Sequence, residues 1–470
     1  MDFRRVSVTQ LANDVRSGRT GARELVAHAL ARVDALNDAV NAFVAVDDTA
    51  ALEAASRIDE AVAAGRDPGP LAGIPIGVKD LEDAAGFVTS HGSPVFAGGA
   101  AATADSSLVA RLKAAGCVVI GKTNTPELGW KGDTDNTVFG PTRNPWNLDH
   151  SPGGSSGGSA AAIASGMVPL ATGSDGGGSI RIPSSCCALS GVKPSLGRVP
   201  SGGPEPPDWQ HLSTKGPMAR KLADVVTALD VVVGPDPTDL RSLPRPEASW
   251  PAALLDAQMP VRVAWSPTLG YAPVDDEVRQ ICARAVGVLE ALGVEVVEIE
   301  AVFDEDPVQD WLTLAMAYNL RTLAPYRGTD VWARIDPLLS ASMDWAAEHL
   351  GVLDLVRAED ACHRLNTRLV DLFHDVRLLV TPTCAAAPPP RALEASGMIN
   401  GVVDPNWVRF TYPFNMTRSP AATVCAGLSG DGLPIGLQLV GPQHADLVVI
   451  RSAAALEAAL GFDEVAPVGT

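Results

Sequence analysis

The chain carries Gly153-Gly154-Ser155-Ser156-Gly157-Gly158-Ser159 and, about one helix later, Gly173-Ser174-Asp175-Gly176-Gly177-Gly178-Ser179-Ile180-Arg181-Ile182-Pro183. Glycine-rich serine stretches are often flexible linkers, but both of these clusters lie between apolar runs and small-residue segments. Because glycine has no Cβ, several backbone N–H groups can converge on one point beside a serine hydroxyl. That arrangement can hold an oxyanion next to a nucleophile, so the clusters predict acyl transfer by a serine.

Short apolar runs and helical patterns alternate around the two clusters. Runs bounded by turn residues predict buried strands at 74–78, 117–120 and 168–171. Apolar residues at helical spacing predict helices over 20–36, 48–64, 105–115 and 156–165. Buried strands that alternate with helices indicate an α/β sheet covered by helices on both faces.

From residue 195 onward the alternation of strands and helices continues after one long loop. Strands are predicted at 261–265, 294–299, 378–380 and 434–440, and helices over 220–233, 275–292 and 445–460. Residues 195–217 are rich in Pro, Gly and Ser and predict a long ordered loop.

Residues 305–375 are mostly helical in pattern and hold much of the aromatic content of a chain that is only 5% aromatic. The aromatic residues of this segment are Trp311, Tyr318, Tyr326, Trp332, Trp345 and Phe373. Side chains of this kind usually pack in an ordinary helix core. The other interpretation is a cap of helices over a substrate pocket, and the sequence leaves both open.

The composition is that of a globular protein and excludes several classes of function. The 470 residues are 46% hydrophobic, with 55 acidic and 36 basic residues and a formal charge of −19. No block of Lys or Arg is present, which argues against a nucleic-acid partner. The thinly spread cysteines, together with the absence of a signal core or a long apolar run, predict a cytoplasmic protein without a membrane partner. No repeat or linker divides the chain, so residues 1–470 are expected to form one domain.

Residues 116–123 match the phosphate-loop pattern G-x-x-x-x-G-K-[ST] but have the wrong context for a nucleotide site. The middle residues Cys-Val-Val-Ile favour a buried strand, and the following Asn124-Thr125-Pro126 is poor material for a helix. The histidines are scattered and no C-x-x-C pair occurs, so no metal and no cofactor are expected.

Lys79 follows a fully apolar predicted strand in Gly73-Ile74-Pro75-Ile76-Gly77-Val78-Lys79-Asp80. One interpretation is a surface lysine whose stem covers apolar area while its amine reaches water. The other is a desolvated, neutral lysine that acts as a base, because burial lowers the pKa of an ammonium group.

The two clusters together resemble the signature of the amidase signature family, with the expected gap between them. Other segments resemble the family in the same order: Gly73–Asp80, Gly121–Asn124, Gly140–Trp146, Gly191–Pro194, Gly216–Arg220, Pro413–Asn415 and Leu433–Gly441. The resemblance runs from about residue 5 to about 460, and only 240–375 lacks landmarks. It implies a large central mixed β-sheet covered by helices on both faces, with 240–375 as a variable, mostly helical region that caps the substrate pocket.

The resemblance also implies a Ser–Ser–Lys triad. Carried over by position, Ser179 is the nucleophile, Ser155 is the bridging serine after a cis peptide that follows Gly154, and Lys79 is the base. The backbone N–H groups of Ser179 and of the residues before it would hold the oxyanion. The other expected oxyanion donors are Gly176, Gly177 and Gly178. The residues expected to support the loop are Ser156, Asp175 and Arg181.

The substrate pocket is less well defined by the sequence. Gly176 stands where relatives often carry a larger residue, which predicts a looser nucleophile loop. Gly129 and Trp130 align with positions that line the acyl channel of fatty-acid amide hydrolase, although Trp130 could equally belong to the core. With Trp311 and Tyr318 they suggest a pocket for an apolar acyl or aryl group.

These observations favour a free-standing amidase that cleaves small or medium amides, and also esters or carbamates. The alternative is the glutamine-hydrolysing amidase subunit of a tRNA-dependent amidotransferase, although residues 311–328 lack the run that such subunits use to read glutamine. A fold without catalysis, used as a scaffold, is disfavoured by the intact Lys79, Ser155 and Ser179. A homodimer is expected, because dimers are common in the family.

Overall fold

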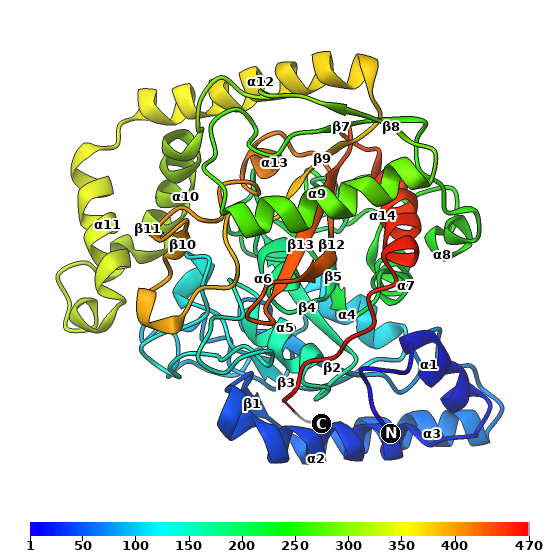
Figure 1. The fold of residues 1–470 in the computed structure, drawn as a ribbon. Helices are drawn as coiled ribbons and strands as arrows, with labels where there is room; N and C mark the ends of the chain where they lie inside the picture. Colours follow the sequence, from blue (N-terminus) through cyan, green and yellow to red (C-terminus); the bar gives the residue numbers. More distant parts are fainter. Residues whose placement is uncertain (469–470) are drawn as a thin grey trace.

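A single mixed sheet runs through the computed structural model, which describes residues 1–468 (Figure 1). Within these residues the sheet has 11 strands. In spatial order they are β1 (Phe43–Val46), β3 (Val118–Thr123), β2 (Pro75–Lys79), β4 (Leu170–Asp175), β6 (Thr214–Ala219), β5 (Ser190–Lys193), β12 (Ala421–Leu428), β13 (Pro434–Val440), β9 (Leu379–Pro382), β7 (Arg262–Trp265) and β8 (Glu295–Glu298). The pairs of β2 with β3 and β4, and of β7 with β8 and β9, are parallel, and the other pairs are antiparallel.

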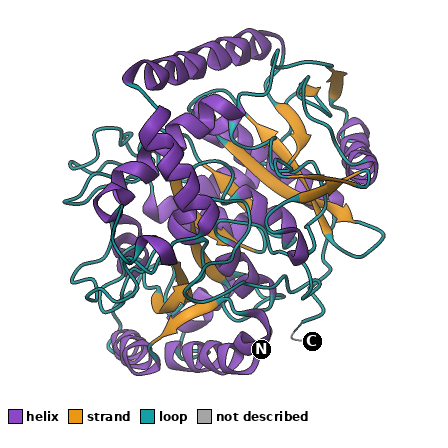
Figure 2. Ribbon diagram, turned by 90° about the vertical axis from the view of Figure 1, so that its left-hand side faces the viewer, coloured by secondary structure: helices purple, strands orange, loops and turns teal. Residues whose placement is uncertain are grey.

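Helices cover both faces of this sheet, as the side view in Figure 2 shows. The α-helices of the described residues are α1 (Val8–Arg16), α2 (Ala22–Val40), α3 (Asp48–Ala63), α4 (Ser107–Ala114), α5 (Gly157–Ala164), α6 (Arg181–Cys186), α7 (Leu222–Val232), α8 (Trp250–Ala253), α9 (Asp276–Ala291), α10 (Val308–Leu323), α11 (Pro337–His349), α12 (Val352–Asp375), α13 (Pro413–Met416) and α14 (Asp446–Leu460). The expected α/β fold with a large mixed central sheet is confirmed. Among the described residues no helix combines the length and the apolar character needed to span a membrane.

The helices α10, α11 and α12 form a layer of their own beside the sheet. Helix α10 packs against both α11 and α12, and α12 runs along the top of the view in Figure 1. The prediction that residues 305–375 are mostly helical is therefore confirmed. A small hairpin of β10 (Gly397–Ile399) and β11 (Val402–Asp404) lies beside this layer.

Apolar periodicity predicted most of the longer elements to within a few residues. In α2, Leu25, Val26, Ala29 and Val33 are buried along one face, as their spacing indicates. The phosphate-loop match is indeed a strand, because β3 covers Val118–Thr123. The amine of Lys122 is held 3.1 Å from the carboxylate of Asp80.

The predicted loop over 195–217 is wrong at its end, where β6 begins at Thr214 and inserts between β4 and β5. Gly216 and Pro217 lower the strand propensity of this segment. Pairing with strands on both sides and near-complete burial outweigh that propensity.

Candidate active site

The two glycine–serine clusters are tight connections that lead into two short helices. The first enters α5 at Gly157, and the second joins the end of β4 at Asp175 to the start of α6 at Arg181. The peptide between Gly154 and Ser155 is cis, as the family resemblance implied. A Cβ on Gly154 would lie 2.3 Å from the carbonyl oxygen of Asp133, so only glycine fits this approach.

Lys79 is the last residue of β2 and is completely buried. Its Nζ donates to Ser155 Oγ at 2.7 Å and to Ser174 Oγ at 3.0 Å. Burial lowers the pKa of Lys79 to about 7, and the negative charges of Asp175 and Glu82 offset this only in part. The interpretation of a surface lysine is therefore wrong, and the amine can be neutral near pH 7 while it faces a serine hydroxyl.

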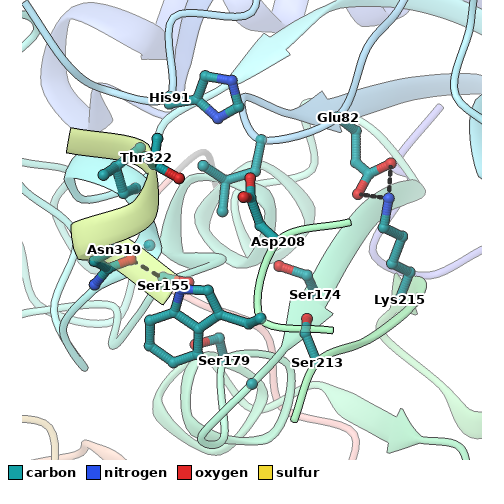
Figure 3. A pocket seen from close by; sticks show the side chains of 15 residues that line it. Glu82, His91, Ser155, Ser174, Ser179, Asp208, Ser213, Lys215, Asn319 and Thr322 are labelled. Atoms are coloured by element: carbon teal, nitrogen blue, oxygen red, sulfur yellow. Dashed lines mark hydrogen bonds and ion pairs between the residues drawn. The ribbon is translucent and has the colours of Figure 1, made fainter. Parts of the chain in front are cut away.

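Serines of both clusters line one cavity of about 90 Å³, and Lys79 contacts two of these serines. Ser155, Ser174 and Ser179 line it, and the backbone N–H of Ser156 donates to the carbonyl of Ser179 at 3.3 Å. Figure 3 shows Ser174 and Ser179 in one half of the cavity, with His91 across from them. Ser174 was not assigned a role from the sequence, although it lies within the second cluster.

The nucleophile loop keeps some of its N–H groups free. Among the described residues, the N–H groups of Gly176, Gly177 and Ser179 make no hydrogen bond. The N–H of Gly178 instead donates to Asp175 Oδ1 at 2.8 Å. This N–H is already used, so the prediction of Gly178 as an oxyanion donor is corrected, whereas the other predicted donors remain available.

Asp175 and Arg181 form a fully buried ion pair behind the loop, at 2.8 Å. Burial alone would raise the pKa of Asp175, but the charge and hydrogen bonds of Arg181 outweigh it and lower the pKa to about 2. Arg181 also donates to Gln438 Oε1 at 2.6 Å and to Asn415 Oδ1 at 2.7 Å. Asn415 in turn donates to the backbone carbonyl of Asp175 at 2.7 Å. Neither Asn415 nor Gln438 was given a role from the sequence, although both lie in segments that resemble the family.

Of the predicted pocket residues, only Gly129 lines the cavity. A Cβ on Gly129 would lie 3.1 Å from Ser155 Oγ. Trp130 instead lines a neighbouring cavity of about 590 Å³ with Met316 and Trp345. Trp311 packs against the outside of the nucleophile loop, and Tyr318 packs in a small apolar cluster of the helical layer.

The wall of the cavity is more polar than the sequence suggested. Helix α10 supplies Asn319 and Thr322, so one helix of the layer contributes to the wall of the cavity. The remaining lining side chains outside the two clusters are Leu81, Glu82, His91, Leu128, Asp208, Trp209, Ser213 and Lys215. Glu82 and Lys215 form an ion pair at 2.7 Å within this wall, as Figure 3 shows. These residues come from segments without a motif, so no sequence signal marked them.

A buried lysine beside two serines and a glycine loop with free N–H groups are the groups that hydrolysis by a serine requires when lysine takes the place of histidine. A family model described as Amidase matches residues 24–450. An acylamidase of Rhodococcus erythropolis is 37% identical over 96% of this chain and 95% of its own length. One of the subunits of the glutamyl-tRNA(Gln) amidotransferase of Salinispora arenicola is 35% identical over 98% of both chains.

Solved structures agree with the sequence comparison. A bacterial aryl acylamidase of the amidase signature enzymes superimposes with a TM-score of 0.90 at 30% identity, covering 97% of this chain and 96% of the other. The chain therefore belongs to the amidase signature family. It is an amidase, a hydrolase that cleaves the C–N bond of carboxylic amides.

Proposed function

We propose that amide hydrolysis proceeds through an acyl-enzyme on Ser179, with Ser155 and Lys79 as the proton relay. The observation that carries this proposal is the 2.7 Å contact between Lys79 Nζ and Ser155 Oγ in a site that lowers the pKa of the lysine to about 7. A serine hydroxyl is a weak nucleophile until a neighbour accepts its proton. A neutral amine at this position can accept that proton at ordinary pH.

The relay of Lys79 and Ser155 acts in both acylation and deacylation in the proposed cycle. Lys79 takes the proton of Ser155, Ser155 takes the proton of Ser179, and Ser179 Oγ attacks the amide carbonyl. The free N–H groups of Gly176, Gly177 and Ser179 bind the oxyanion, where one lost donor costs about 3 kcal/mol of barrier. The relay then runs backward, so that Ser155 protonates the leaving amine. Water finally attacks the acyl-enzyme by the same relay and releases the acid.

Small or medium amides are the proposed substrates, with esters and carbamates as further carbonyl compounds that the same attack can open. The apolar side chains of Leu81, Leu128 and Trp209 supply a wall for an acyl or aryl group. The polar side chains of Asn319 and Thr322 can orient a polar substituent. The similarity to an acylamidase and to an aryl acylamidase supports this substrate class.

Hydrolysis of an aryl anilide and of the matching aryl ester tests the proposal. Wild type is expected to cleave both, and Ser179→Ala and Lys79→Ala are expected to lose the anilide activity by several orders of magnitude. Activity that survives in Ser179→Ala would overturn the mechanism. Ammonia release from glutamine that requires added partner subunits, with no anilide cleavage, would favour the amidotransferase alternative.

The remaining parts of the proposal concern the protein as a whole. Residues 1–470 act as one domain, with the variable region at about 240–375 as the cap of the pocket, which the contribution of Asn319 and Thr322 supports. The enzyme works as a homodimer in the cytoplasm on a small-molecule amide, without a nucleic-acid or membrane partner. Light scattering after size exclusion tests the dimer, and cell fractionation tests the location.

A further inference from the structure

The carbonyl groups of the nucleophile loop are held from behind by three different donors. The carbonyl of Gly176 accepts from Trp311 Nε1 at 3.0 Å, and that of Gly177 accepts from Thr411 Oγ1 at 2.5 Å. The carbonyl of Gly178 accepts from the N–H of Ile182 at 2.7 Å. In a planar trans peptide the C=O and the next N–H point in opposite directions. Each donor therefore sets the direction of one N–H group of the loop.

The three donors orient three N–H groups, of which two stay free and one donates to Asp175. The bond to the Gly178 carbonyl orients the N–H of Ser179, which stays free. The bond to the Gly177 carbonyl orients the N–H of Gly178, which Asp175 accepts at 2.8 Å. The bond from Trp311 orients the N–H of Gly177, which stays free. Trp311 is thus the side chain that sets the direction of one of the available oxyanion donors.

Two glycines of the loop lie in close contact with indole rings. A Cβ on Gly177 would lie 2.4 Å from Trp311 Cζ2, and a Cβ on Gly176 would lie 2.7 Å from Trp209 Cε3. Neither glycine has a φ in the left-handed region, so backbone conformation does not require glycine at either position. Glycine is required at both positions because the indoles of Trp209 and Trp311 approach so closely. Trp209 fills the space that a larger side chain at position 176 would occupy, and the expectation of a looser loop there stays a prediction.

The indole of Trp311 is itself fixed on two sides. It stacks on Tyr412 with ring centroids 5.3 Å apart and meets the edge of Trp209 at 5.8 Å. The hydroxyl of Tyr412 donates to Asp306 and accepts from Asn406 Nδ2, the latter at 2.9 Å. A donor held this firmly can keep the Gly176–Gly177 peptide in one orientation throughout the reaction.

We propose that Trp311 is a positioning residue of the oxyanion site, whose indole N–H aims the N–H of Gly177 at the developing oxyanion. The inference rests on the proposed function, since it needs Ser179 to attack a carbonyl beside this loop. Trp311 lies on α10 and is not among the side chains that line the cavity. Its loss should therefore lower kcat, where the oxyanion matters, and leave KM almost unchanged.

The sharpest test replaces Trp311 by 3-benzothienylalanine, which keeps the shape of indole and exchanges the N–H for sulfur. The expected result is a fall in kcat of about tenfold to a hundredfold, below the cost of removing an oxyanion donor outright. KM for the anilide should stay within about twofold, as expected for an interaction made only in the transition state. An aldehyde or boronic acid that mimics the tetrahedral intermediate should bind more weakly by the same factor as kcat falls.

Trp146→Phe is the matched control. Its indole is half-buried, like that of Trp311, and its Nε1 donates to a backbone carbonyl, that of Cys187, at 3.1 Å. This variant should keep the kcat of wild type. Trp311→Phe serves as a second variant, and the melting temperatures of all proteins show whether a loss reflects unfolding.

The outcomes separate this inference from the proposed function. Full kcat and full inhibitor affinity in the benzothienylalanine protein, with an inactive Ser179→Ala, would overturn the role of Trp311 alone. A rise in KM with unchanged kcat would also overturn it, because the residue would then act on substrate binding. Activity in Ser179→Ala would instead remove the proposed function on which the inference rests.

Discussion

The ends of strands β2 and β5 each carry a buried lysine, Lys79 and Lys193, and only one of them faces a hydroxyl. Both side chains are almost inaccessible, and burial lowers the pKa of each to about 7. Lys79 contacts Ser155 and Ser174 at the cavity, whereas Lys193 Nζ donates to the neighbouring carbonyl of Pro194 at 3.1 Å. We therefore expect that burial and a low pKa are not enough to make a lysine a base, and that the groups facing the amine decide its role.

The largest expected effect is the loss of activity when Lys79 is replaced. In Lys79→Met the relay has no proton acceptor, so kcat for an anilide should fall by about 10⁴-fold or more, as for other members of catalytic triads. The side chain of methionine fills a similar volume without burying a charge. Steady-state hydrolysis at pH 8, with circular dichroism as the check on folding, measures the effect.

Lys193→Met is the matched control for that prediction. Its amine donates to the carbonyl of Pro194 rather than to a serine of the cavity, and kcat is expected to stay within about threefold of wild type. Lys193 does help to lower the pKa of Asp175, although Arg181 contributes more. An equal loss of activity in both variants would show that the two lysines do not differ as the structure indicates.

A smaller but measurable effect is the pH dependence of the wild-type reaction. Lys79 must be neutral to accept a proton, and its pKa lies near 7. Below that pH the ammonium form dominates, so kcat/KM for an amide should fall about tenfold for each pH unit. Above pH 7 the rate should level off. A profile that is flat from pH 5 to 8 would contradict a lysine base of this pKa.

Residues that lie in contiguous motifs could be singled out from the sequence, and the structure brings them close together. Lys79, Ser155, Ser179, Asp175 and Arg181 were located because glycine-rich connections and a buried strand end mark them locally. Their contacts across the sheet follow from the parallel pairing of β2 with β4, which apolar runs predict only in outline.

Residues whose role depends on distant contacts could not be found in this way. Trp311 reaches Gly176 across 135 positions, and Asn415 reaches Asp175 across 240. No periodicity encodes such pairs, so Trp311 was expected to line the substrate pocket instead. Strand β6 was missed for a related reason, since its pairing on both sides outweighs the weak local propensity of Gly216 and Pro217.

The two lysines should affect the free energy of unfolding in the same way, although only Lys79 is expected to affect kcat. Each has a folded-state pKa near 7, below the ordinary value of 10.5 that the unfolded chain retains. Between these values the unfolded state binds more protons than the folded state, so the free energy of unfolding rises with pH across that window. The contribution is up to about 1.4 kcal/mol per pH unit for each lysine.

The difference between wild type and variant isolates this contribution from other titrating groups. From pH 7.5 to 9 the free energy of unfolding of wild type should gain about 2 kcal/mol relative to Lys79→Met, and a similar amount relative to Lys193→Met. Urea unfolding at both pH values measures it. A gain relative to one variant only would mean that the other lysine is not held neutral by burial. Suppose the free energy of unfolding gains similar amounts relative to both variants, while kcat falls in Lys79→Met alone. The hydroxyl groups that Lys79 faces, rather than its burial, would then account for its catalytic role.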